Sequence, residues 1–141
     1  MNDIISLNYD IPADDFTRAG EASGKVKGIL KKMGVAPDLV RKVAIVMYEG
    51  EINMVIHASG GNIKVDISSE EIVMILTDQG PGIADVELAM RAGYSTAPDN
   101  IRSLGFGAGM GLPNMKNYSD TMDIESKVGE GTTITAKVYI G

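Results

Sequence analysis

The sequence predicts an α+β sandwich, in which a mixed and mostly antiparallel sheet carries helices packed on one face. The first observation behind this prediction is the order of elements: strand, two helices, two strands, a glycine-rich stretch, one helix and two strands. A parallel sheet would need a regular alternation of strands and helices instead. The second observation is the length of 141 residues, which fits one domain with a sizeable core, so we expect a single domain over residues 1–141.

The first half of the chain is expected to supply one strand and two helices. Residues 4–11, IISLNYDI, alternate apolar and polar side chains, which is typical of a half-buried strand. Asp14 or Asp15 can cap a helix that extends to about Met33. A second helix, over about 37–58, is apolar around most of its circumference and is therefore expected to be buried.

The second half begins with two consecutive strands, NIKVDIS at 62–68 and EIVMILTD at 71–78, joined by a hairpin. Residues 80–111 are rich in glycine and turn-forming residues and leave room for one short helix near 84–91. A loop of that length inside a compact domain is usually functional. The remaining elements are expected to be a helix over about 109–119 and strands at 121–128 and 132–140.

The composition is that of a globular protein, with 44% apolar and 23% charged residues. The chain has no cysteine, which excludes disulfides, a thiolate nucleophile and a cysteine-rich zinc site. It shows neither a long apolar stretch nor a signal peptide, so we expect a cytoplasmic protein. The net charge of −6 argues against nucleic acid as the main partner, but backbone amides could still bind a phosphate ligand.

Three glycines recur in the first expected helix at a spacing of four, at Gly20, Gly24 and Gly28. This spacing puts them along one face of the helix, and each is unfavourable there by about 1 kcal/mol relative to alanine. Tight packing inside the monomer is one explanation, and a self-association surface that gives a homodimer is the other.

Glu49, Asn53 and His57 lie at i, i+4 and i+8 on one side of the second helix, whose other sides are apolar. A carboxylate on a buried helix is unfavourable unless it is paired or faces a cleft. This side of the helix could simply face water, or Glu49 and Asn53 could present oxygen atoms to a ligand and a hard cation such as Mg²⁺. Glu51, about 200° from Glu49 around the helix, is expected to face solvent.

The strand at 71–78 runs directly into Asp78, and Gly80 and Gly82 follow in the segment DQGPGI. A carboxylate held at a strand end beside bare backbone can accept a hydrogen bond from an exocyclic amine, such as that of adenine, on a flat ligand. A plain Gly-Pro-Gly turn is the alternative.

The segment GFGAGMGL has glycine at alternate positions before a short helix, at Gly105, Gly107, Gly109 and Gly111. Exposed amides at a helix N-terminus bind anions, so a phosphate site is one interpretation and a flexible linker the other. The segment matches neither the Rossmann fingerprint nor the Walker loop. In GEGT, Thr132 could reach a ligand through its hydroxyl, or the segment could be a simple hairpin turn.

In this order, EGEIN, DQGPGI, GFGAGMGL and GEGT resemble the N, G1, G2 and Gly-Thr boxes of the GHKL superfamily of ATP-binding proteins. That superfamily includes histidine kinases, gyrase-type ATPases and Hsp90 chaperones. Within it, the chain most resembles the small anti-sigma factor serine/threonine kinases of bacterial partner-switching systems, whose N box also places a glutamate four residues before the asparagine. The resemblance covers about residues 4–140.

The resemblance implies a Bergerat fold, also called the histidine kinase-like ATPase fold, with ATP and Mg²⁺ as cofactors and a lid at about 84–108. It implies that Asn53 ligates Mg²⁺, that Glu49 is the general base and that Asp78 binds the adenine amino group. The other residues implied to bind the nucleotide are Gly80, Gly82, Ile83 and Thr132 near the base, and Gly105, Gly107, Gly109, Gly111 and Leu112 near the phosphates.

The resemblance also implies a function, which is phosphorylation of a serine or threonine on a small STAS-type antagonist protein, with a sigma factor as a second partner. The sequence has one histidine and shows no transducer domain after the predicted ATP site, so we expect neither a complete histidine kinase nor a member of the gyrase and Hsp90 branches. Its lid segment RAGYSTAPDNIRSLGFGAG differs from the simpler lids of typical anti-sigma kinases, which leaves sigma-factor binding open. A nucleotide-gated binding module with little catalysis is the alternative.

Overall fold

The computed structural model describes residues 4–11, 20–57, 60–80 and 111–140 of the chain. Their element order agrees with the expected one and confirms the predicted α+β class. The elements are β1 (Ile5–Ile11), α1 (Glu21–Lys32), α2 (Pro37–His57), β2 (Gly61–Ile67), β3 (Glu71–Asp78), α5 (Gly111–Tyr118), β4 (Thr121–Lys127) and β5 (Gly131–Tyr139).

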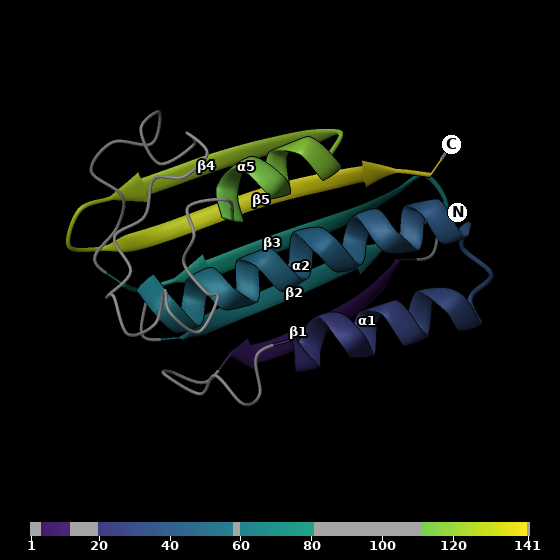
Figure 1. The fold of residues 1–141 in the computed structure, drawn as a ribbon, viewed down its shortest axis with the longest axis horizontal. Helices are drawn as coiled ribbons and strands as arrows, with labels where there is room; N and C mark the ends of the chain where they lie inside the picture. The colour runs from purple at the N-terminus through teal and green to yellow at the C-terminus, as the bar shows by residue number, and fades with distance from the viewer. Residues whose placement is uncertain (1–3, 12–19, 58–59, 81–110, 141) are drawn as a thin grey trace.

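The strands form one open sheet in the order β1-β2-β3-β5-β4, and each neighbouring pair is antiparallel. The three described helices lie together on one face of this sheet, with α2 across its middle (Figure 1). Two layers therefore enclose a single core, as the alternating strands and the apolar second helix predict.

The core forms where one face of the sheet meets α2. Alternate residues of the central strands, such as Ile63 and Val65 in β2 and Met74 in β3, have no exposed surface because successive strand residues point to opposite faces. In α2, Val43 and Met47 are equally buried. Among the described helices, none combines the length and the apolar character that a membrane span requires.

The first helix differs from its prediction at its start. Gly20 adopts a left-handed conformation with φ of 95°, so a helix that begins at Asp14 or Asp15 cannot continue through it, and α1 begins at Glu21. Asp14 and Asp15 themselves lie outside the described residues.

The structure also argues against one of the two explanations for the glycines of α1, Gly24 and Gly28, which together are called the glycine face. A β-carbon added at Gly24 or Gly28 would meet no atom within 4 Å. Tight packing inside the monomer therefore does not explain these two glycines, because the space beside them is open.

Candidate active site

The N-terminus of α5 lies directly against the Asn53 side chain of α2. A β-carbon added at Gly111 would lie 2.9 Å from Asn53 Oδ1 and 3.0 Å from Asn53 Nδ2, closer than real side-chain carbons come. Glycine at this position lets the first turn of α5 approach the Asn53 side chain this closely, whereas a larger residue would require that side chain to move. Leu112, the next residue, is buried in the core and anchors the helix start.

Glu49 lies one turn before Asn53 on α2, and its side chain is half-buried. Burial raises the pKa of the Glu49 carboxyl above its ordinary value, while a side-chain hydrogen bond with Asn114 of α5 lowers it. A carboxylate with a raised pKa is better matched to accept a proton near neutral pH than an ordinary surface glutamate.

A second group of predicted residues lies at the end of β3. Asp78 pairs across the sheet with Thr132 of β5. One carboxylate oxygen of Asp78 accepts a hydrogen bond from the Gly80 amide at 2.9 Å, and the other accepts none from a residue that the structure describes. The Thr132 hydroxyl is buried and lies 2.8 Å from the Ser126 hydroxyl, which fixes its orientation.

Two glycines flank Asp78 on the neighbouring strands. A β-carbon at Gly61 of β2 would lie 3.2 Å from Asp78 Cβ, and one at Gly131 of β5 would collide with the Asp78 carbonyl oxygen. Gly61 also joins the two groups of residues, because the same position lies 3.0 Å from Sδ of Met54, the residue after Asn53. The C-terminal part of α2 and the end of β3 are therefore adjacent.

Glu51 does not face solvent, which corrects the expectation for this residue. Only 1% of its surface is exposed, and its carboxylate accepts hydrogen bonds from the amides of Gly20 at 3.0 Å, Ala22 at 3.3 Å and Ser23 at 2.6 Å. The amides at the start of α1 have no hydrogen-bond acceptor within the helix, and the positive end of the helix dipole lies there. Both features favour a carboxylate at this place. The prediction failed because helical spacing gives the direction of a side chain but not what packs opposite it.

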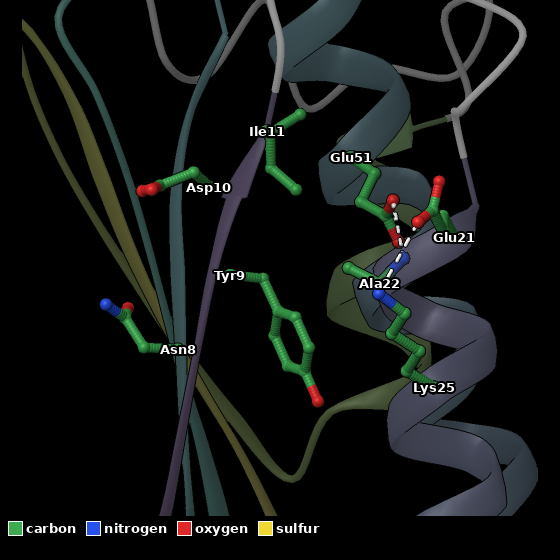
Figure 2. A pocket seen from close by; sticks show the side chains of 8 residues that line it. All are labelled: Asn8, Tyr9, Asp10, Ile11, Glu21, Ala22, Lys25 and Glu51. Atoms are coloured by element: carbon green, nitrogen blue, oxygen red, sulfur yellow. Dashed lines mark hydrogen bonds and ion pairs between the residues drawn. The ribbon is translucent and has the colours of Figure 1, made fainter.

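Figure 2 shows Glu51 reaching the first turn of α1 beside a cavity between β1 and α1. The cavity has a volume of about 190 Å³, and its lining includes Tyr9 and Lys25. Burial raises the pKa of the Tyr9 hydroxyl. None of the sequence-predicted site residues lines this cavity, since Glu49 and Asn53 point to the other side of α2.

Several predicted positions lie outside the described residues, namely Gly82, Ile83, Gly105, Gly107, Gly109 and the lid at about 84–108. The side chain of His57, the last residue of α2, is likewise outside them. Two residues near the site were missed by the sequence reasoning, Asn114 and Gly61. The sequence spacing could have pointed to Asn114, because this residue follows Gly111 by three positions and therefore lies on the same face of the helix.

Comparison with known proteins shows which family has this architecture. Residues 30–140 match the model of the histidine kinase-, DNA gyrase B- and HSP90-like ATPases. The chain belongs to this ATPase family. The match covers most of the chain and spans both groups of site residues, from α2 to β5.

Individual relatives are similar to this chain over most of their length. An anti-sigma F factor of Geobacillus kaustophilus is 31% identical over 121 residues, which cover 82% of this chain and 80% of the relative. An anti-sigma F factor of Priestia megaterium is 30% identical over 122 residues, with the same coverage. The serine/threonine-protein kinase RsbT of Bacillus subtilis is 30% identical over 114 residues, which cover 78% of this chain and 80% of that protein.

The residues present fit the nucleotide that an ATPase binds. Asp78 places its carboxylate at a strand end whose neighbours, Gly61 and Gly131, lack side chains. The amide side chain of Asn53 supplies an oxygen of the kind that Mg²⁺ accepts, beside the N-terminus of α5, where anions are favoured. ATP binding follows from membership of the ATPase family.

Proposed function

We propose that this chain is a Mg-ATP-dependent serine/threonine protein kinase of the anti-sigma, partner-switching type. Its substrate would be a serine or threonine on a small STAS-type antagonist protein, and a sigma factor would be a second partner. The observation that carries the proposal is the half-buried carboxylate of Glu49, one turn before Asn53 and bonded to α5. The names of the relatives, anti-sigma F factor and serine/threonine-protein kinase, support it.

In this proposal, each group of residues has a separate task. Asn53 ligates Mg²⁺, Asp78 binds the adenine amino group, and Gly80, Gly82, Ile83 and Thr132 shape the base pocket. The amides of Gly105, Gly107, Gly109, Gly111 and Leu112 contact the phosphates, with the lid at about 84–108 as part of one domain over residues 1–141. Mg-ATP, when bound, supplies the phosphoryl group and neutralises its charge.

Glu49 would accept the proton of the attacking serine or threonine hydroxyl. Its burial supports this role, because a raised pKa strengthens the carboxylate as a base. Phosphoryl transfer otherwise depends on positioning and charge neutralisation, which the other site residues would provide. Partners of this kind would meet the protein in the cytoplasm. The open space beside Gly24 and Gly28 of α1 would accommodate a second copy of the chain in a homodimer.

A nucleotide-gated binding module is the second candidate. The observation that favours it is that several relatives at about the same identity are named only as anti-sigma factors. Such a module would capture a sigma factor or another regulator when nucleotide is bound, and it would need no base at position 49.

Labelled ATP, incubated with the purified protein and candidate STAS-type proteins, distinguishes the two functions. We expect labelled phosphoserine or phosphothreonine on the partner, and loss of a general base in Glu49→Gln should slow its formation by about a hundredfold or more. Nucleotide affinity of this variant should stay near that of the parent. Glu70→Gln, on the exposed β2–β3 hairpin, serves as the control. Nucleotide binding without any phosphoprotein in the parent would favour the binding module instead.

The binding residues need a separate measurement, since both functions require them. Asn53→Ala and Asp78→Asn should each weaken Mg-ATP binding by about tenfold or more, as expected when a contact to a charged group is lost. Calorimetric titration measures this, with Asp123→Asn on the exposed side of β4 as a control. If both variants bind as tightly as the parent, the assignment of the site is wrong.

A further inference from the structure

We infer that Asn114 is a positioning residue for the reaction: its side-chain amide donates a hydrogen bond that holds the Glu49 carboxylate in place for the incoming hydroxyl. This inference rests on the proposed function of Glu49 as the base. It assigns a role to a residue of α5 that lies outside the four boxes used to predict the site.

The antiparallel packing of α2 and α5 brings the two side chains together. Gly111 of α5 lies against Asn53 of α2. Asn114 follows Gly111 by three residues on α5, so these two lie on the same side of that helix. Glu49 precedes Asn53 by four residues on α2, so these two also share a side, and the two sides face each other. This packing places Asn114 opposite Glu49. We attribute the lowering of the Glu49 pKa by Asn114 to a hydrogen bond between these two side chains.

The same packing of α2 against α5 continues beyond this pair. A β-carbon added at Gly50 would collide with Leu76 and would lie 3.5 Å from Cε of Met115, a residue with no exposed surface. Further along, the Arg41 guanidinium lies 5.9 Å from the centre of the Tyr118 ring. Asn114 therefore lies on a helix that packs against α2 on both sides of this position, and a positioning residue requires such support.

The chemistry of the pair gives the bond one direction. An ionised carboxylate only accepts hydrogen bonds, so the amide of Asn114 is the donor, and the carboxylate keeps capacity to accept a proton from a substrate hydroxyl. Burial alone would raise the pKa of Glu49 and favour the protonated form, which cannot act as a base. The bond from Asn114 opposes this by lowering the pKa.

The other ionisable side chains on the two helices near this pair are engaged elsewhere or exposed. Glu51 binds the start of α1, Tyr118 lies against Arg41, and Lys116 is exposed. Asn114 is thus the described neighbour that sets the state of the Glu49 carboxylate together with burial.

The first test compares Asn114→Leu with the parent at saturating Mg-ATP. Leucine has a similar volume but no donor, so phosphoryl transfer should slow by about tenfold, as expected when a charged group loses one hydrogen bond. The nucleotide dissociation constant should change by less than about twofold. Asn117→Leu, an exposed asparagine on the same helix, is the matched control and should behave as the parent does. Asn114→Ala serves as the second variant if the leucine side chain disturbs folding.

A double-mutant cycle tests whether Asn114 acts through Glu49. In the Glu49→Gln background, Asn114→Leu should change the remaining rate by less than about twofold, because its partner is already altered. An equal slowing in both backgrounds would overturn the inference, since Asn114 would then act by another route.

Carboxyl-carbon NMR titration of Glu49 tests the contact without any substrate. The pKa of Glu49 should be higher in Asn114→Leu than in the parent, and Asn117→Leu should leave it unchanged. An unchanged pKa in Asn114→Leu would overturn the inference even if the protein is a kinase. A raised pKa together with no phosphoryl transfer in the parent would support the contact and show that the proposed kinase function alone had failed.

Discussion

Glu51 is a buried carboxylate that stabilises the start of a helix other than its own. Replacing it with alanine leaves the amides of Gly20, Ala22 and Ser23 without their acceptor. We expect Glu51→Ala to lower the free energy of unfolding by about 3 kcal/mol, from the loss of a cap and of buried charged hydrogen bonds.

Denaturant unfolding measures this effect. Glu130→Ala is a suitable control. Glu130 forms an exposed ion pair with Lys127, at 3.3 Å, and such a pair contributes at most about 1 kcal/mol to the free energy of unfolding. Equal midpoints for the two variants would mean that Glu51 does not cap α1.

For the proposed kinase function, the raised pKa of Glu49 predicts a pH dependence of phosphoryl transfer. Glu49 accepts a proton only when ionised, so the rate should fall as the pH drops through its pKa. Because burial raises that pKa, the midpoint should lie above the ordinary value of 4.5. A pH profile of the maximal rate with saturating Mg-ATP measures it, and a midpoint at or below 4.5 would contradict the role given to burial.

At the scale of elements, the β4–β5 turn holds two glycines with different constraints. Gly131 has φ of 124°, and an added β-carbon would collide with the Asp78 backbone, whereas Gly129 has φ of 82° and open space around it. We expect Gly131→Ala to lower the free energy of unfolding by about 3 kcal/mol or more, and Gly129→Ala by about 1 kcal/mol. Thermal unfolding of the two variants measures the difference. Similar losses of unfolding free energy in both would show that the Asp78 backbone can move to make room for a side chain at position 131.

The strands and α2 could be predicted because their apolar periodicity reflects burial directly. The strand predicted at 71–78 coincides with β3, where alternate residues such as Ile72 and Met74 face the helices. The start of α1 could not be predicted in the same way. Gly20 continues the helical spacing in the sequence, but in the structure it is a left-handed N-cap whose amide donates to Glu51, 31 residues further along the chain.

The candidate site was predictable to the extent that its residues belong to local motifs. Glu49, Asn53 and Asp78 are read from short segments of sequence, and the structure brings their elements together. Asn114 and Gly61 were not, because each matters through the packing of an element distant in sequence. Tertiary contacts of this kind leave no local pattern beyond helical spacing.

For the whole molecule, the glycine face of α1 gives a test of self-association. Alanine is more favourable than glycine in the interior of a helix. A β-carbon added at Gly24 or Gly28 would have no atom within 4 Å, so neither replacement would cause a clash. The double alanine variant should therefore stabilise an isolated chain by about 1–2 kcal/mol. Denaturant unfolding, together with light scattering after size exclusion, measures stability and mass. A variant that instead loses stability and half its mass would show that a second copy covers this face.

The pairing of the strands also decides how this protein can be handled in experiments. Ile5 pairs with Ile67, which pairs with Ile72, which in turn pairs with Val138, so β1 starts and β5 ends at the same end of the sheet. Figure 1 shows both termini there, while Asp78 closes β3 at the opposite end. A sensor chip or a fluorescent protein can thus be attached at that end of the sheet while the end that carries the proposed nucleotide site points away from the attachment.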